Sequence, residues 1–263
     1  MRVTTDLPEV VPYLRDLEPR ADDDWPPGEP LEFRIAREDG RACVRAGPVV
    51  VSVSEDPAIL VRDLHLYLYS TVMDGLRDHL RLHAASGSVD GRFFLLSGYR
   101  GAGKTTLLLR LLLDGADAHG DENVLVKDGR LRTFPRRFYL KHGTLDCLPE
   151  LRAACAGKRR YPGFYGGWMH YVDPTDVGRA WRSAEGLPYA AFHLEPDFGA
   201  EPRLEPCAKT SMVQHLLGHA LNLERDTGGH IASLCRALAA CRCHTLRVGD
   251  LAKTAALVRG ALA

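Results

Sequence analysis

A glycine-rich segment that ends in a lysine and a threonine is the strongest chemical signal in the chain. Residues 98–105, GYRGAGKT, satisfy the pattern G-x-x-x-x-G-K-[ST] in full. In this pattern the glycines let backbone N–H groups wrap a phosphate, and the N-terminus of the following helix adds positive charge. Lys104 is expected to reach the β- and γ-phosphates, and the Thr105 hydroxyl to ligate Mg²⁺. The predicted nucleotide-binding residues are Gly98, Tyr99, Arg100, Gly101, Ala102, Gly103, Lys104, Thr105 and Thr106.

Two adjacent acids, Asp121 and Glu122, lie in the sequence Gly-Asp-Glu-Asn further along the chain. Asp121 follows Lys104 by 17 residues, which leaves room for a helix, a tight turn and one strand. This spacing predicts that the acids lie at the C-terminal end of the adjacent strand, where ligands of open α/β sheets bind. A carboxylate there can hold Mg²⁺ or accept the proton of an attacking hydroxyl, and two acids could divide these tasks. The same residues are also typical of a solvated turn, so spacing alone leaves both interpretations open.

A hydrophobic strand and a leucine-rich helix are predicted on either side of the glycine-rich segment. The strand, residues 92–97, follows residues 82–89 across the turn Asp90-Gly91, so the two runs are expected to form a hairpin. The helix is expected over residues 105–113, and a short strand over 116–119 then leads to the acids.

The remainder of the chain alternates short strands with helices, which indicates an α/β fold. Further strands are expected at 31–35, 42–45, 49–54, 124–126, 131–138 (a strand or an extended arm), 189–194 and 243–248. Further helices are expected at 58–81, 208–222, 228–241 and after Gly249-Asp250. Residues 19–30 combine prolines with an acidic run and are interpreted as a loop or linker. Residues 1–60 are therefore predicted to form a small, β-rich α+β extension that precedes a main domain over 61–263.

A long irregular region is expected between Gly143 and Pro174. It mixes basic residues, among them Arg159 and Arg160, with aromatic residues and many glycines. Long loops of this composition are often lids or binding loops, and a disordered surface excursion is the alternative. Arg159 and Arg160 are the candidates for substrate contact in this region.

Composition and charge restrict the classes of function. The chain has 263 residues, of which 45% are hydrophobic and 26% charged, and its formal net charge is zero. A neutral balance argues against nucleic acid or an anionic membrane as the main partner. No stretch has the ~18 apolar residues that a membrane span needs, and the first residues lack the features of a signal peptide, so a cytoplasmic location is expected. The seven cysteines are expected to be reduced thiols.

From Leu82 onward the order of these features resembles the HPr kinase/phosphorylase family. In that family a histidine precedes the hairpin, a phosphate-binding loop follows, and an acidic pair comes one strand later; here these are His83, residues 98–106, and Asp121 with Glu122. Three later segments resemble the smaller HPr kinase-related proteins found among peptide-tailoring enzymes. These segments are FPRRFYLKHGTLDCLPEL, YVDPTDVG and CRCHTLRVGDLAKTAALV. The resemblance covers about two-thirds of the chain and implies a P-loop kinase core of the HPr kinase/PEP carboxykinase-like type, a mixed sheet flanked by helices.

The resemblance also implies roles for individual residues. Asp121 would be the catalytic carboxylate that takes the proton of the acceptor hydroxyl, and Glu122 would assist Asp121 and Thr105 in holding Mg²⁺. His83 would face the γ-phosphate, with a structural histidine in a strand as the alternative. Arg137 and Lys141 would be candidates for phosphate or substrate contact.

The implied activity is ATP-dependent phosphorylation of a hydroxyl, on Ser or Thr of a peptide or protein. The long glycine-bearing signature of the family is absent, and residues 1–60 do not resemble the N-terminal domain of the bifunctional bacterial enzyme. HPr itself is therefore not carried over as the substrate, and precursors of peptide natural products are the nearest substrate class. Because HPr kinases assemble as hexamers, the resemblance also allows a homo-oligomer.

Two other functions remain open at this stage. Small-metabolite kinases of the shikimate-kinase type also have an acid about this far beyond the lysine of the loop. A nucleotide-binding module without catalysis would serve as a sensor, although the intact Lys104, Thr105 and Asp121 argue against this. A zinc site formed by Cys235, Cys241, Cys243 and His244 is not favoured, because their spacing differs from that of zinc ligands.

Overall fold

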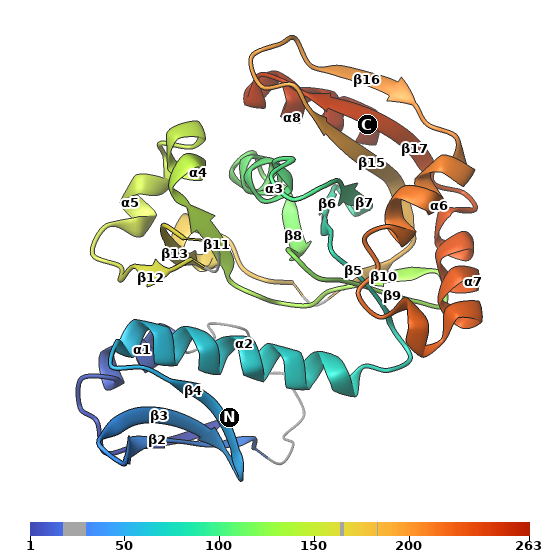
Figure 1. The fold of residues 1–263 in the computed structure, drawn as a ribbon. Coiled ribbons are helices and arrows are strands. Elements are labelled where there is room, and N and C mark those ends of the chain that lie inside the picture. The colour runs from blue at the N-terminus through green and yellow to red at the C-terminus, as the bar shows by residue number, and fades with distance from the viewer. Residues whose placement is uncertain (18–29, 164–165, 183) are drawn as a thin grey trace. The chain divides into compact units, whose positions relative to one another are not determined.

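The computed structural model describes residues 1–17, 30–163, 166–182 and 184–263, and within these ranges the chain is a mixed α/β protein with several mixed sheets. It divides into two compact units (Figure 1). The first unit comprises Met1–Leu76, Tyr139–Gly143 and Cys155–Tyr171; the second comprises Arg77–Phe138, Thr144–Ala154 and Val172–Ala263. Apart from Pro30, the linker expected over 19–30 lies outside the described residues.

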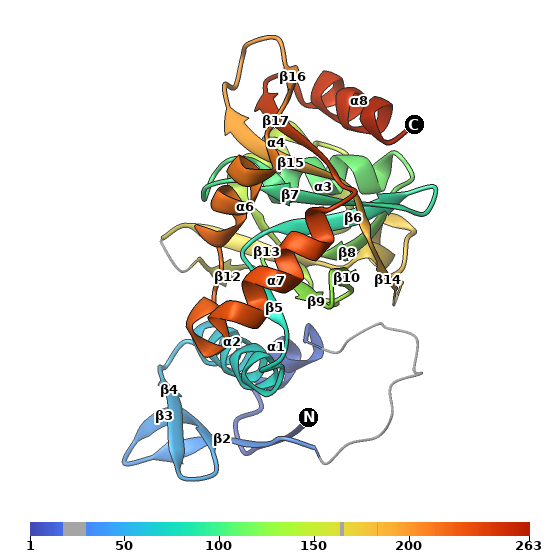
Figure 2. The same ribbon diagram turned by 90° about the vertical axis from the view of Figure 1, so that its right-hand side faces the viewer.

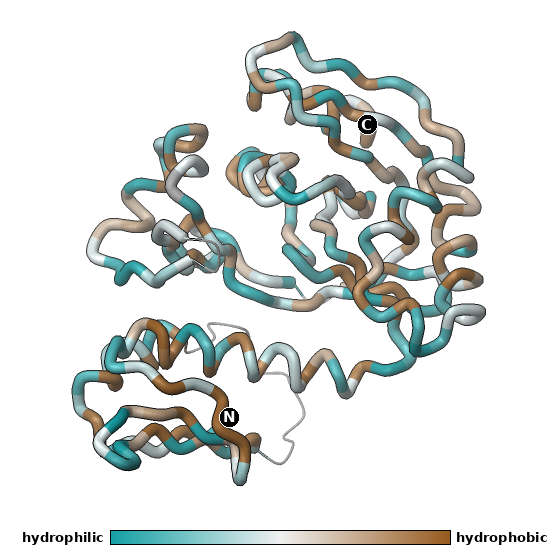
Figure 3. The backbone as a smooth tube through the Cα atoms, in the orientation of Figure 1, coloured by the Kyte–Doolittle hydropathy of each residue, from teal (hydrophilic) through white to brown (hydrophobic). Residues whose placement is uncertain are grey.

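The first unit is built on a four-stranded sheet with the order β1-β2-β3-β4. Its strands are β1 (Arg2–Thr5), β2 (Glu32–Glu38), β3 (Arg41–Ala46) and β4 (Val49–Val53). Helix α2 (Pro57–Gly75) packs against this sheet, and apolar residues recur along it (Figures 1 and 3). The short helix α1 (Val11–Arg15) packs on α2. The strands expected near 31–54 are therefore confirmed.

A second, three-stranded sheet contributes to the same hydrophobic core. Its order is β11-β13-β12, from β11 (Phe138–Lys141), β12 (Tyr161–Pro162) and β13 (Trp168–Val172). Tyr161, Met169 and Tyr171 are buried in one cluster with Leu60 and Leu64 of α2. The prediction of an irregular region from Gly143 to Pro174 was wrong for this part, because non-local burial of aromatic side chains gives a glycine-rich stretch a defined strand pairing.

The predicted boundary at residue 60 also needs correction. Leu60 begins no new unit: it is buried in the core of the first unit together with Leu64, and this unit continues to Leu76. The helix expected over 58–81 ends at Gly75, and Leu80–Leu82 forms β5 instead. The alternate side chains of Leu80 and Leu82 pack into the core of the second unit, which requires the period of a strand.

The second unit contains a six-stranded sheet with the order β16-β17-β15-β7-β6-β8. Its strands are β6 (Ala85–Val89), β7 (Arg92–Ser97), β8 (Asp117–Gly120), β15 (Pro188–Pro196), β16 (Arg203–Pro206) and β17 (Arg242–Val248). Strands β7, β15 and β17 are parallel, and β6 is antiparallel to both β7 and β8. The hairpin predicted around Asp90-Gly91 is confirmed, with φ of 50° and 76° at the two turn residues and Val89 paired with Arg92.

Helices cover both sides of this sheet. They are α3 (Lys104–Leu113), α6 (Lys209–Leu217), α7 (Thr227–Leu238) and α8 (Leu251–Leu262). Helices α6 and α7 bury Met212, Leu216 and Leu234 against Leu95 and Ala191 of the sheet. Helices α3 and α8 pack against each other and lie on the other side of the sheet from α6 and α7 (Figure 2). The helices predicted in these four regions are confirmed, with shorter bounds for α6 and α7.

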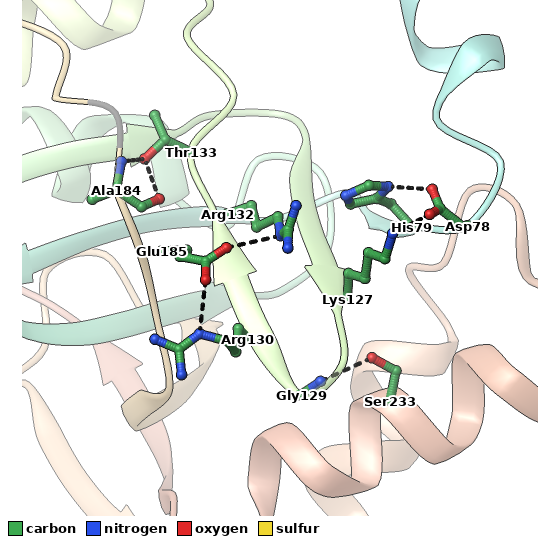
Figure 4. Close-up of polar contacts among 10 residues, drawn as sticks. All are labelled: Asp78, His79, Lys127, Gly129, Arg130, Arg132, Thr133, Ala184, Glu185 and Ser233. Atoms are coloured by element: carbon green, nitrogen blue, oxygen red, sulfur yellow. Dashed lines mark hydrogen bonds and ion pairs between the residues drawn. The ribbon is translucent and has the colours of Figure 1, made fainter.

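A smaller four-stranded sheet, with the order β14-β10-β9-β5, completes the second unit. Its other strands are β9 (Val124–Lys127), β10 (Arg130–Arg132) and β14 (Glu185–Gly186). The Glu185 carboxylate pairs with Arg130 at 3.2 Å and Arg132 at 3.1 Å, so two arginines of a basic run serve strand pairing (Figure 4). The short helices are α4 (His142–Cys147), α5 (Leu151–Cys155), η1 (Pro174–Val177) and η2 (Leu223–Arg225).

Candidate nucleotide site

The loop between β7 and α3 has a backbone that only glycine adopts easily. Gly98, Gly101 and Gly103 have φ of 149°, 84° and 92°, all outside the range that side chains favour. At Gly98 there is also no space, because a Cβ atom would lie 2.9 Å from the carbonyl oxygen of Leu194. The predicted order of strand, glycine-rich loop and helix is therefore confirmed, and the loop directs the N-terminal amides of α3 outward from the sheet edge.

Lys104 crosses this loop from the first position of α3. Its side chain is buried, and Nζ donates hydrogen bonds to the carbonyl oxygens of Gly98 at 2.7 Å and Tyr99 at 3.2 Å. A buried ammonium needs such acceptors, and phosphate oxygens would be stronger partners because they carry charge. The lysine is thus in the position from which it could bind a phosphate in the loop.

Thr105 and Asp121 are in direct contact at the start of α3. The Thr105 hydroxyl lies 3.0 Å from both carboxylate oxygens of Asp121, whose side chain is buried. Asp121 follows β8, which is parallel to β7, so both strands end at the same edge of the sheet. The predicted position at a strand's C-terminal end is confirmed, but β8 is not adjacent to β7. The antiparallel strand β6 lies between them, because the hairpin preceding the loop pairs on that side.

The two neighbouring acids have different surroundings. Burial, followed by the negative charge of Glu122, raises the pKa of Asp121 well above its usual range. Burial also acts to raise the pKa of Glu122, but the hydrogen bond from His83 and the charges of Arg136 and Lys104 outweigh it and lower that pKa. Of the pair, Glu122 is therefore the more readily ionised group.

His83 joins this cluster through Glu122. Its Nδ1 lies 3.1 Å from Oε2 of Glu122, and its ring is about a quarter exposed, so it is not a core histidine. Its backbone N–H donates to the carbonyl oxygen of His219 at 2.8 Å. The structure thus brings together the predicted residues His83, Lys104, Thr105, Asp121 and Glu122.

Three further histidines lie near the loop. The ring of His219 makes an edge contact with Tyr99, their centroids 5.3 Å apart. His193 at the end of β15 stacks on His215 of α6 at 3.7 Å, and burial, then the positive neighbours His215, His219 and Lys104, lower the pKa of His193 to about 4. The only signal in the sequence was the four-residue spacing of His215 and His219, which by itself indicates no more than a shared helix face.

The predicted substrate residues are not gathered at this loop. Arg137 belongs to the second unit, where its Nε lies 3.9 Å from Oδ2 of the buried Asp173. Lys141, Arg159 and Arg160 belong to the first unit. There Arg159 pairs with Asp16 at 3.2 Å. Substrate contact by these four residues stays a prediction.

The oxygen donors at the loop fit a magnesium ion. Both Asp121 oxygens share one Thr105 hydroxyl, which has a single proton, so acceptor capacity is left over in a buried carboxylate. Mg²⁺ is usually held by one or two carboxylates together with phosphate oxygens and water, so Thr105, Asp121 and Glu122 are a suitable donor set. Within the described residues, no group of three or more His, Cys, Asp or Glu could hold a metal, Cys235, Cys241, Cys243 and His244 included.

Comparison with known proteins adds no assignment to this geometry. The chain matches no protein-family model and no curated protein sequence. In the part of the chain that the structure describes, none of the helices combines the length and apolar character needed to cross a membrane.

Proposed function

We propose that the chain is an ATP-dependent kinase that transfers the γ-phosphoryl group to a hydroxyl, and that its second unit is a P-loop kinase core. The observation that carries this proposal is the contact between the Thr105 hydroxyl and both oxygens of the buried Asp121, behind a complete glycine-rich loop. A metal-binding hydroxyl and a carboxylate are the pair that phosphoryl transfer needs next to a phosphate-binding loop.

The loop would bind the phosphates. Backbone N–H groups of residues 98–106 and the N-terminal end of α3 favour negative charge, and Lys104 would exchange the carbonyl oxygens of Gly98 and Tyr99 for phosphate oxygens. These groups would neutralise charge on the transferred group without reorganising in the reaction.

Thr105, Asp121 and Glu122 would hold Mg²⁺, which would supply charge neutralisation at the β- and γ-phosphates. Asp121 would align the acceptor hydroxyl and accept its proton. His83 would hold Glu122 in place through the 3.1 Å contact and would lie toward the γ-phosphate.

The acceptor class rests on the resemblance to HPr kinase-related proteins. We propose a Ser or Thr hydroxyl of a peptide or protein, including precursors of peptide natural products. Assembly into a homo-oligomer and a cytoplasmic location stay predictions of the sequence.

The test uses γ-labelled ATP, Mg²⁺ and an extract of the source cells divided into protein, peptide and small-metabolite fractions. Label on a peptide or protein hydroxyl is expected; label in the metabolite fraction would instead indicate a small-metabolite kinase. Asp121→Asn should retain ATP binding and lose at least 100-fold in transfer rate, since general base catalysis contributes about 10²–10⁴-fold.

The matched control is Lys253→Ala, which removes an exposed ion pair with Glu201. It should leave both ATP binding and transfer unchanged. Transfer that survives in Asp121→Asn would overturn the role of this residue. Nucleotide binding without label in any fraction would favour a sensor.

A further inference from the structure

An exposed aromatic side chain lies beside the glycine-rich loop and has no role in the proposed phosphate chemistry. Phe198 is 66% exposed, although it is large and apolar. A Cβ atom at Gly103 would lie 3.8 Å from Cε1 of the Phe198 ring and 3.9 Å from Cγ1 of Val248. The ring edge is therefore close to the residue that precedes Lys104.

The strand order tells which side of the loop this is. The acids approach Thr105 from the side of β6 and β8, whereas β15 and β17 lie on the opposite side of β7. A triphosphate whose γ-phosphate faces Asp121 must extend its nucleoside away from the acids. Its base is then directed toward the segments that follow β15 and β17, and Phe198 is in the first of these.

The turn that carries Phe198 is held in place. The Asp197 N–H donates to the carbonyl oxygen of Val248 at 2.9 Å, and the Ala200 N–H donates to that of Asp197 at 3.0 Å. Gly249 packs so closely that a Cβ atom would lie 2.0 Å from the Ala200 carbonyl oxygen. These contacts hold the backbone on both sides of the exposed ring.

Tyr99, the other exposed aromatic residue of the loop, faces the other way. Its ring contacts His219, and the carbonyl oxygen of His219 accepts the N–H of His83, which pairs with Glu122. Tyr99 is thus linked to the side of the acids, where an acceptor would bind.

We propose that Phe198 is the platform on which the nucleobase stacks. This inference rests on the proposed binding of a nucleoside triphosphate at the loop. Every base presents a π-face, so stacking on one aromatic ring raises affinity with little choice among bases. ATP and GTP are therefore both expected to use Phe198, and inorganic tripolyphosphate is not.

The experiment is calorimetric titration of the full chain with ATP, GTP and tripolyphosphate, each in the presence of Mg²⁺. Phe198→Ala should weaken ATP and GTP about five- to tenfold, the lower part of the range for base–aromatic stacking, and leave tripolyphosphate binding unchanged. Phe198→Tyr should bind as the parent chain does. Lys104→Ala should weaken all three ligands.

The matched control is Trp168→Ala, which removes an aromatic side chain of similar exposure in the first unit. Unchanged ATP affinity in Phe198→Ala, an equal loss for tripolyphosphate, or a nucleoside-selective loss in Tyr99→Ala would each overturn the platform while leaving the proposed kinase intact. If the parent chain binds neither ATP nor tripolyphosphate, the proposed function fails, and the platform fails with it.

Discussion

Asp121 and Glu122 are neighbours in sequence, but their surroundings separate them chemically. Asp121 is buried and shares the Thr105 hydroxyl, whereas Glu122 is about one-third exposed and pairs with His83. Glu122 also has a φ of 63°, which turns its side chain away from the path that a regular strand would give. Two similar carboxylates can take different tasks when their environments differ in this way.

The glycine at the start of the loop provides a prediction at this scale. Gly98→Ala should lower the free energy of unfolding by about 1–3 kcal/mol, because the left-handed φ of 149° is combined with the close Leu194 carbonyl oxygen. Chemical denaturation followed by circular dichroism measures this change.

Gly101→Ala is the matched variant, since its φ is also positive but nothing lies within 4 Å of its Cβ position. It should cost about 1 kcal/mol from the backbone alone. Equal losses in the two variants would show that the approach of Leu194 is not what requires glycine at position 98.

At the scale of elements, α3 depends on its neighbours because it must hold the loop and Lys104 in place. Helix α8 packs directly against α3, and its first turn is capped by Asp250, whose carboxylate accepts the Lys253 N–H at 2.9 Å. An N-cap of this kind satisfies a helix N–H that would otherwise lack a partner within the helix.

Asp250→Ala should therefore lower the free energy of unfolding by about 1 kcal/mol. The measurement is again chemical denaturation. Lys253→Ala, in the same turn, removes only an exposed ion pair and should change stability by about 0–0.5 kcal/mol. A loss in Lys253→Ala as large as that in Asp250→Ala would contradict a capping role.

At the scale of the whole molecule, the first unit is assembled from three separate stretches of the chain. Leu60 and Leu64 share one buried cluster with Tyr161, Met169 and Tyr171, about 100 residues later. Residues 1–60 are therefore part of a core that later segments complete, and not an independent extension.

A chain truncated to residues 61–263 should expose the remaining apolar residues of this cluster. We expect increased fluorescence of a hydrophobic dye and aggregation in size-exclusion chromatography, because an apolar patch of this kind is an aggregation hazard. The full chain is the control. A truncated chain that stays monodisperse and binds no dye would support the boundary at residue 60.

Features that depend on a few consecutive residues could be predicted from the sequence. The Asp-Gly turns at 39–40, 90–91 and 128–129 all have positive φ at both residues and join paired strands. The loop at 98–105 and the position of Asp121 at the end of a strand followed in the same way. Local backbone preference determines such features, because the glycines and short polar residues that they need are visible in the sequence.

Other features were decided by contacts between distant residues. The insertion of β6 between β7 and β8, the contact of His219 with Tyr99 and the position of Phe198 beside Gly103 have no local signal. The end of α2 at Gly75 likewise depends on the burial of Leu80 and Leu82 in another core. Sequence alone therefore determined the phosphate-binding loop and its likeness to kinases, whereas the tertiary structure decided which side chains surround it, because packing among distant segments sets those neighbours.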